Sequence, residues 1–275
     1  MDTNSALNKI DENKNLIQKL RPLTADQARR VAEYYRIHLT FTSNSLEGNS
    51  LTLNETKVLL EKGLTACGKP IAHALEAIGH ADAYDLMLKI ANQNSFDNLL
   101  DILLQLHYLF YSKIDLLNAG KYRQDNVYIS GFDIKLPDYK LVTELMLNFK
   151  NDFLEIKDLW HPIILASYAH RRLVEIHPFI DGNGRISRLL MNLILINHGY
   201  QIISIPTQRR KEYILSLNNS CRKATKNYDL MISYTSFDNF LIEMELAAQK
   251  NYMRLLGIDP KNPVTPDPEN SGPRP

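Results

Sequence analysis

Cysteine is scarce in this chain of 275 residues: only Cys67 and Cys221 occur, and they form no CxxC pair. This scarcity excludes the disulfide framework of a small secreted domain, and a reducing cytoplasm is the expected compartment. An excess of positive charge is also missing, because 32 basic residues face 31 acidic ones. A dedicated nucleic-acid binder carries a broad positive field, so we expect no nucleic acid among the partners.

Long apolar runs are missing as well. Residues 189–196 form one of the longest, and Asn192 interrupts it, whereas a helix needs about 20 apolar residues to span a bilayer. Residues 1–18 are polar and charged, unlike the basic and then apolar pattern of a secretory signal. We therefore expect neither export nor insertion into a membrane.

Apolar residues at helical spacing dominate the chain instead. Thr24 is the expected N-cap of the first helix, Asn54 opens the second, and Gly199 is the expected C-cap of the last. The pattern predicts helices over residues 25–39, 54–61, 71–91, 99–114, 138–155, 160–174 and 185–198. Packed together, these helices predict an all-α bundle.

One segment breaks the helical pattern. Residues 126–134 alternate in polarity, are rich in β formers and contain a Ser130–Gly131 turn signal, which predicts an isolated β-hairpin that leans on the bundle. The free edge of a hairpin is a site where another chain can add as a strand. Residues 257–275 hold six of the twelve prolines, which predicts a flexible tail.

Residues 177–188, HPFIDGNGRISR, carry the strongest chemical signal. His177 is a candidate general base, and Asp181 is a hard oxygen ligand of the kind that Mg²⁺ uses together with substrate phosphates. A glycine-spaced turn that leads into a helix aims backbone N–H groups at an anion. Arg185 and Arg188, three residues apart, are suited to clamp phosphates. The segment predicts phosphoryl or nucleotidyl transfer, and it is not a Walker motif.

This segment matches the HPFxDGNGRxxR signature of Fic domains, a family of protein AMP-transferases. Residues 99–248 resemble the Fic core in the order of their helices and hairpin, including the Gly120–Lys121–Tyr122–Arg123 stretch. The resemblance implies a Fic-type helical bundle with a β-hairpin flap at residues 126–137. It also implies an amino-terminal helical region over residues 1–98 that carries an inhibitory motif.

The resemblance implies an adenylyltransferase reaction. His177 would deprotonate a Ser, Thr or Tyr hydroxyl of a target protein, which attacks the α-phosphate of ATP. The flap would hold the target's segment as an added strand, and the enzyme is also expected to label itself. The implied ligands are Mg²⁺ on Asp181, phosphates on the backbone of Gly182, Asn183 and Gly184 and on Arg185, and the γ-phosphate on Arg188.

Two positions leave alternatives. Tyr213 falls where the family often lines its adenine pocket, but a core tyrosine is an equal interpretation. Gly184 resembles the AMP-transferring majority, whereas the phosphorylating Doc-type toxins carry lysine there. Phosphocholine transfer, known for a rare member, would use the same base and metal.

A second motif lies before the core. Residues 43–48, SNSLEG, match the [S/T]xxxE[G/N] inhibitory signature of Fic proteins. The resemblance implies that Glu47 pairs with Arg188 and takes the place that the γ-phosphate needs, with Ser43 as the first motif residue, so the enzyme rests inhibited. In the animal Fic enzyme, which residues 45–49 resemble, the same glutamate supports removal of AMP, so we hold reversal open here.

The remaining polar residues have ordinary interpretations. We expect His73, His80, His107, His161 and His170 to be packed or surface imidazoles rather than zinc ligands. The basic run 209–211 predicts a solvated face, or else a position near nucleotide phosphates. The alternative function is a non-catalytic Fic module that senses ATP or docks partners. The oligomeric state, the target and the signal that relieves inhibition stay open.

Overall fold

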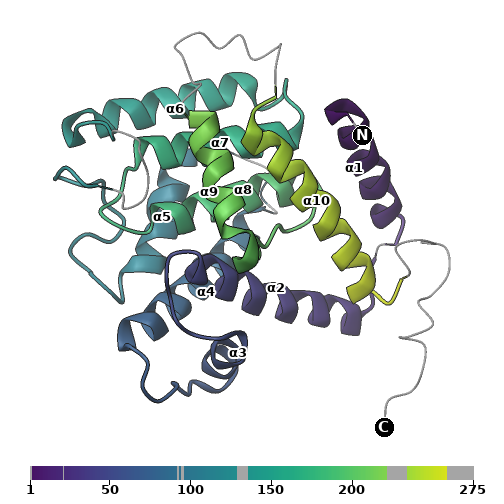
Figure 1. The fold of residues 1–275 in the computed structure, drawn as a ribbon, viewed down its shortest axis with the longest axis horizontal. Coiled ribbons are helices and arrows are strands. Elements are labelled where there is room, and N and C mark those ends of the chain that lie inside the picture. The colour runs from purple at the N-terminus through teal and green to yellow at the C-terminus, as the bar shows by residue number, and fades with distance from the viewer. Residues whose placement is uncertain are drawn as a thin grey trace.

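The computed structural model describes residues 2–20, 22–91, 93, 96–128, 136–221 and 234–258. Throughout these residues the chain folds into helices and connecting segments without a β-strand, so the predicted all-α class is confirmed (Figure 1). The helices are α1 (Thr3–Gln18), α2 (Ala25–Ser45), α3 (Leu53–Lys62), α4 (Ile71–Ala91), α5 (Leu99–Tyr111), η1 (Tyr139–Leu141), α6 (Val142–Ile156), α7 (Pro162–Ile176), α8 (Asn183–Asn197), η2 (Thr207–Arg209), α9 (Arg210–Cys221) and α10 (Ser236–Leu255).

Capping side chains set several helix starts. Thr24 accepts a hydrogen bond from the backbone N–H of Gln27, and the Gln27 side chain returns one to Thr24, so this predicted N-cap is confirmed. The same arrangement joins Thr52 and Glu55 at the start of α3. The position of Asn54 as the first residue of that helix was therefore wrong, because the capping box starts the helix at residue 53.

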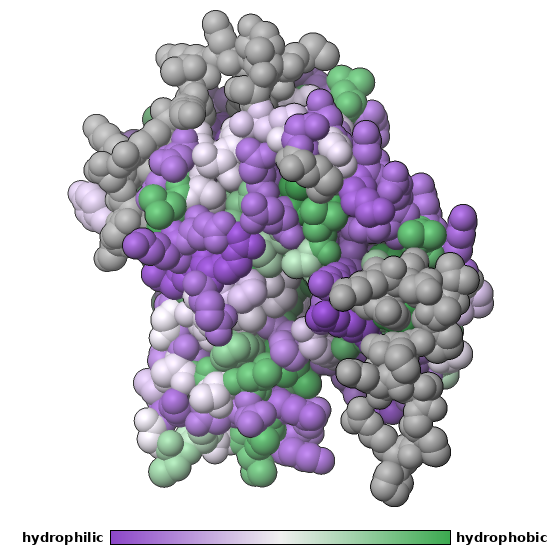
Figure 2. Space-filling view, turned by 45° about the vertical axis from the view of Figure 1, so that its right-hand side comes forward, coloured by the Kyte–Doolittle hydropathy of each residue, from purple (hydrophilic) through white to green (hydrophobic). Residues whose placement is uncertain are grey.

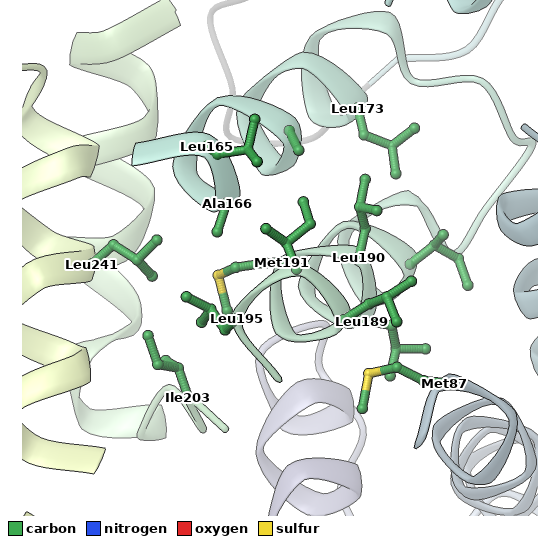
Figure 3. Packing of buried hydrophobic residues seen from close by; sticks show 14 of the residues in the cluster. Met87, Leu165, Ala166, Leu173, Leu189, Leu190, Met191, Leu195, Ile203 and Leu241 are labelled. Atoms are coloured by element: carbon green, nitrogen blue, oxygen red, sulfur yellow. The ribbon is translucent and has the colours of Figure 1, made fainter. Parts of the chain in front are cut away.

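Helix α8 forms the centre of the core. It is buried on nearly all sides, as expected of a helix surrounded by others. Figure 3 shows its side chains Leu189, Leu190, Met191 and Leu195 facing Leu165, Ala166 and Leu173 of α7, Met87 of α4 and Leu241 of α10. Asn192 is fully buried, and its amide binds the carbonyl oxygens of Arg188 and Ile203 and the N–H of Ile203. The helix whose first turns carry the end of the 177–188 motif is therefore fixed on several sides by the core.

The amino-terminal helices share this core. Helices α2 and α4 pack against α8, and α1 lies alongside α10 (Figure 1). Gln249 of α10 donates to the carbonyl oxygen of Ile10 at 2.9 Å. One cluster of buried residues extends from α1 to the end of α10. The division into residues 1–98 and 99–248 stays a prediction.

Three helices, α1, α9 and α10, are not among the predicted ones. Only four residues of α1 are buried, Ala6, Leu7, Ile10 and Ile17, and charged residues separate them, which weakens the periodic signal. Helix α9 turns its polar Ser216 inward beside Leu217, so its apolar pattern is interrupted.

Two predicted features lie largely or wholly outside the described residues. The hairpin falls mostly on residues 129–135, and the described flanks 126–128 and 136–138 are not in strands; the flap stays a prediction. The tail at 259–275 also lies outside the described residues. Within the described part of the chain, no helix has the length and apolarity that a membrane span requires. Apolar patches interrupt the hydrophilic surface on the face shown in Figure 2.

Candidate active site

His177 closes α7 in an unusual backbone conformation. Its φ of 52° lies in the left-handed region, where no other non-glycine residue of the described chain is found. Its N–H caps the helix on the carbonyl oxygen of Leu173 at 2.9 Å, and its Nδ1 lies 3.2 Å from the carbonyl oxygen of Val174. A carbonyl oxygen only accepts, so Nδ1 carries the proton and Nε2 keeps its lone pair. Burial lowers the pKa of His177, which leaves a neutral base at neutral pH.

The loop between α7 and α8 is fastened by Asn183. Its side chain accepts the N–H of Phe179 and donates to the carbonyl oxygen of the same residue, both at 2.9 Å. Gly182 adopts a φ of 81°, and a Cβ there would lie 2.7 Å from a ring carbon of Phe110. The turn therefore requires glycine, and it opens α8 with unpaired N–H groups of its first turn. This is the anion-binding geometry that the motif predicts.

His107 of α5 holds the same loop through hydrogen bonds of its two ring nitrogens. Its Nδ1 accepts the N–H of Gly120 at 2.9 Å, so its Nε2 carries the proton and donates to the carbonyl oxygen of Asp181 at 3.2 Å. The ring stacks on Phe179 with centroids 3.9 Å apart. Burial lowers its pKa to about 4. The expectation of a packed imidazole is met by its burial, but its contact with the motif loop has no signal in the sequence.

Asp181 and Arg185 form a two-pronged ion pair. Both carboxylate oxygens of Asp181 lie 3.1 Å from Nη2 of Arg185, and one also accepts the N–H of Gly182. The Asp181 side chain is 55% exposed, whereas Arg185 is buried over the ring of Phe110. Among the described residues no three His, Cys, Asp or Glu side chains gather as a metal site. An ion at Asp181 would therefore share its coordination with ligand phosphates, as Mg²⁺ commonly does.

Arg188 binds the second motif, residues 43–48, directly. Its Nη2 donates to Glu47 Oε1 at 2.7 Å and to the carbonyl oxygen of Ser43 at 2.8 Å, while Nε donates to Ser43 Oγ at 3.0 Å. Burial raises the pKa of the Glu47 carboxyl, but the charge and hydrogen bond of Arg188, with help from Arg185, outweigh it and lower the pKa overall. Glu47 is therefore ionised at neutral pH.

Glu47 lies over the start of α8. A Cβ built on Gly184 would be 2.3 Å from Glu47 Oε1. The carboxylate thus occupies the space above the first helical turn, where the helix dipole favours negative charge. The chain's own carboxylate fills a place that suits a phosphate.

Tyr213 binds on the other side of Arg188. Nη1 of Arg188 donates to the Tyr213 hydroxyl at 3.2 Å, which leaves the hydroxyl proton for Nε2 of His170 at 3.0 Å. His170 is fully buried, and burial holds its pKa well below the ordinary value. Tyr213 therefore touches the motif through its oxygen. Its predicted adenine contact stays a prediction.

Glu47, His177, Gly184 and Tyr213 line one cavity of about 750 Å³, a volume in the range of small-molecule sites. Arg210 and Lys211 line it too, and Nε of Arg210 donates to the carbonyl oxygen of Leu46 at 2.8 Å. Of the two interpretations of the basic run, these two residues favour a position near phosphates. Arg209 instead pairs with Glu212 and Glu243.

Arg123 is a site residue that the sequence analysis does not single out. It is 2% exposed, and its guanidinium donates to the carbonyl oxygens of His177 at 2.8 Å, Asp125 at 2.9 Å and Pro137 at 2.7 Å. Its own N–H binds the carbonyl oxygen of Pro178 at 2.8 Å. Arg123 therefore ties the candidate base to both ends of the segment where the flap is predicted.

Comparison with known proteins agrees with this geometry. The model of the Fic/DOC family matches residues 96–195. A protein adenylyltransferase Fic of Nematostella vectensis is 34% identical over 216 residues, which are 78% of this chain and 50% of that protein. One from Drosophila grimshawi is 35% identical over 208 residues, 74% of this chain and 42% of that protein. The chain thus spans about half the length of these curated relatives, or less.

Solved structures share the fold. The crystal structure of a Fic-domain-containing signaling protein from Bacteroides thetaiotaomicron superposes with a TM-score of 0.80 at 23% identity, over 91% of this chain and 97% of that one. A variant of Fic-1 from C. elegans gives a TM-score of 0.77 at 26% identity, over 92% of this chain and 72% of that one.

Proposed function

The chain belongs to the Fic/DOC family, and on that premise we propose that it is a self-inhibited protein adenylyltransferase. It transfers AMP from ATP to a Ser, Thr or Tyr hydroxyl of a target protein. One observation carries the proposal: a neutral histidine base, an open helix start and the pair Glu47–Arg188 line or border one cavity.

His177 acts as the general base. Its Nε2 removes the proton from the target's hydroxyl as the hydroxyl oxygen attacks the α-phosphorus of ATP. The bond from that phosphorus to the bridging oxygen breaks, and pyrophosphate leaves. The N–H groups at the start of α8 and the guanidinium of Arg185 stabilise the charge that develops on the phosphate oxygens. Arg188 binds the γ-phosphate.

Asp181 fits a Mg²⁺ ligand by its chemistry, because it is a half-exposed carboxylate beside the phosphate cradle. Bound there, Mg²⁺ would neutralise phosphate charge. Asp181, which contacts Arg185 in this structure, would hold the ion, and Arg185 would then be available to the phosphates.

Glu47 switches the site off by competition. Its carboxylate binds the same guanidinium that the γ-phosphate needs, so ATP binds productively only when Glu47 leaves. Because Glu47 is ionised and faces the cavity of His177, it is also suited to orient a water for AMP removal, which we include in the proposal. The flap at 126–137 docks the target or a second copy of the chain by strand addition. The compartment we propose is the cytoplasm.

The test uses ATP labelled at the α- or the γ-phosphate. Glu47→Gly should raise α-label on the chain or on proteins of a lysate at least about tenfold, since a lost charged hydrogen bond is worth about 1.5–3 kcal/mol. Glu47→Gly/His177→Asn should abolish the label, and asparagine tolerates the left-handed backbone of that position. Transfer of γ-label alone would overturn the proposal in favour of kinase chemistry. ATP binding without any transfer would favour the non-catalytic module.

A further inference from the structure

Glu76 of α4 lies between the two motifs. Its Oε1 is 3.0 Å from Nη1 of Arg185, and its Oε2 accepts a hydrogen bond from Nδ2 of Asn49 at 2.7 Å. Asn49 follows Glu47 by two residues, and Arg185 precedes Arg188 by three. Both motif arginines are therefore connected to the same short turn, Arg188 through Glu47 and Arg185 through Glu76 and Asn49.

Asn49 is built into that turn. It is 8% exposed, and its Nδ2 also donates to the carbonyl oxygen of His73 at 2.9 Å. Its Oδ1 accepts the N–H of Leu51 at 3.0 Å. Its own N–H returns to the carbonyl oxygen of Asn44 in α2, at 3.1 Å. The side chain thus fixes the turn that presents Glu47 and fastens it to α4.

We propose that Glu76 and Asn49 are positioning residues for inhibition, a second attachment that holds the Glu47 turn on the catalytic motif. The inference rests on the proposed function, because it concerns how that activity is kept low. The Glu47 side chain is 37% exposed, and among the described residues its one ion pair is with Arg188. A turn fastened beside it keeps the carboxylate close to Arg188 and so raises its effective concentration there.

The charges support this arrangement. Arg185 is nearly buried and lies between two carboxylates, Asp181 and Glu76. If Asp181 held a cation instead, Glu76 would still balance the charge of the Arg185 guanidinium. Glu76 therefore contacts Arg185 and the Glu47 turn at the same time, through separate carboxylate oxygens.

Glu76→Gln is the discriminating variant, because it keeps the size of the side chain. A glutamine is uncharged and has one acceptor oxygen, so it loses the ion pair with Arg185 and can keep at most the hydrogen bond from Asn49. In the full chain with Glu47 intact, Glu76→Gln should raise AMP transfer about three- to tenfold, as for the loss of one charge-assisted hydrogen bond. Asn49→Ala should do the same. In the Glu47→Gly chain neither change should raise transfer, because the inhibitory carboxylate is gone.

Ser50→Ala is the matched control. Ser50 lies in the same turn, and both its backbone N–H and its Oγ bond Nδ1 of His73; alanine keeps the backbone bond, so transfer should stay unchanged. An equal loss of transfer by Glu76→Gln in both backgrounds would overturn the proposal, because Glu76 would then serve Arg185 alone.

Hydrogen exchange separates this inference from the activity itself. The amides of residues 47–49 should exchange faster in Glu76→Gln than in the parent chain, whether or not any AMP is transferred. Unchanged exchange there would overturn the second attachment. Absence of transfer from the Glu47→Gly chain, with faster exchange in Glu76→Gln, would instead sink the proposed activity and leave the attachment standing.

Discussion

Arg123 and Arg188 are equally buried, each 2% exposed, yet they are held in opposite ways. The side chain of Arg123 donates only to backbone carbonyl oxygens, those of His177, Asp125 and Pro137. Arg188 donates to side chains and one carbonyl, and among its acceptors is the half-exposed carboxylate of Glu47. Backbone acceptors stay where the fold puts them, whereas a carboxylate on a side chain can be exchanged for a phosphate.

The electrostatics of the two arginines differ accordingly. Burial lowers the pKa of Arg123, and the charge of Asp138 compensates only in part. Burial also acts to lower the pKa of Arg188, but Tyr213 and Glu47 reverse it and the pKa is raised. We therefore call Arg123 and its three carbonyl acceptors the frame around the base. We call the pair Arg188–Glu47 the lock, because its carboxylate can be exchanged for a phosphate.

The largest expected effect is a loss of folding stability when Arg123 is replaced. Arg123→Met should lower the free energy of unfolding by about 3 kcal/mol or more, because it leaves three carbonyl oxygens without their donor. Thermal unfolding measures the loss. Arg188→Met, measured beside it, should cost clearly less, since Glu47 is free to turn to water. Equal losses would erase the distinction between frame and lock.

The next effect concerns the lock itself. Glu47→Gln keeps the shape of the side chain but removes its charge, which weakens the contact with Arg188 by about 1–2 kcal/mol. ATP should then bind about tenfold more tightly by calorimetry. Arg123→Lys, which keeps the charge of the frame residue, should leave this affinity unchanged. If Glu47→Gln bound ATP no better than the parent chain, competition at Arg188 would be excluded.

A smaller effect separates two roles of Tyr213. Tyr213→Phe keeps the ring and removes the oxygen that Arg188 and His170 share. If the hydroxyl positions Arg188, ATP affinity in the Glu47→Gly chain should fall about three- to tenfold, as for one lost hydrogen bond. Unchanged affinity would leave adenine stacking as the role of the ring.

The smallest effect is that of pH. The pKa of Glu47 is lowered, so its carboxylate form, and with it the lock, persists from pH 8 down to its ordinary range near 4.5. The pKa of His177 is lowered too, so the base loses activity only as the pH falls below about 6.5. The ratio of transfer by Glu47→Gly to that by the parent chain should therefore stay constant between pH 6 and 8. A ratio that changes across this range would show that the lock titrates.

The sequence predicted the parts of the site that are continuous in the chain. The helical pattern, the cap at Thr24 and the segment 177–188 depend on local spacing, which survives in the structure. The contact between Glu47 and Arg188 spans 141 residues and was expected only through the resemblance to a family. Such a long-range pairing leaves no periodic trace.

Three residues that support the site were not predicted in that role, because their contacts leave no local signal in the sequence. His107 and Arg123 act on backbone carbonyl oxygens, and Glu76 joins residues from two distant segments. Every residue has a backbone carbonyl oxygen, so the residue type of the acceptor cannot predict which carbonyl a side chain will bind. The place of Asn54 was misjudged for a related reason, since Thr52 and Glu55 together outweigh a single favourable residue at a helix start.

The close contact between Gly184 and Glu47 has a consequence for any residue that replaces the glycine. A side chain at position 184 would begin 2.3 Å from Glu47 Oε1, closer than two such atoms can lie. Because Oε1 ends a flexible side chain, a larger residue at 184 would push the Glu47 carboxylate aside and away from its contact with Arg188. If Glu47 restrains activity as proposed, a chain with a larger residue at 184 would be restrained less, although neither motif arginine has changed.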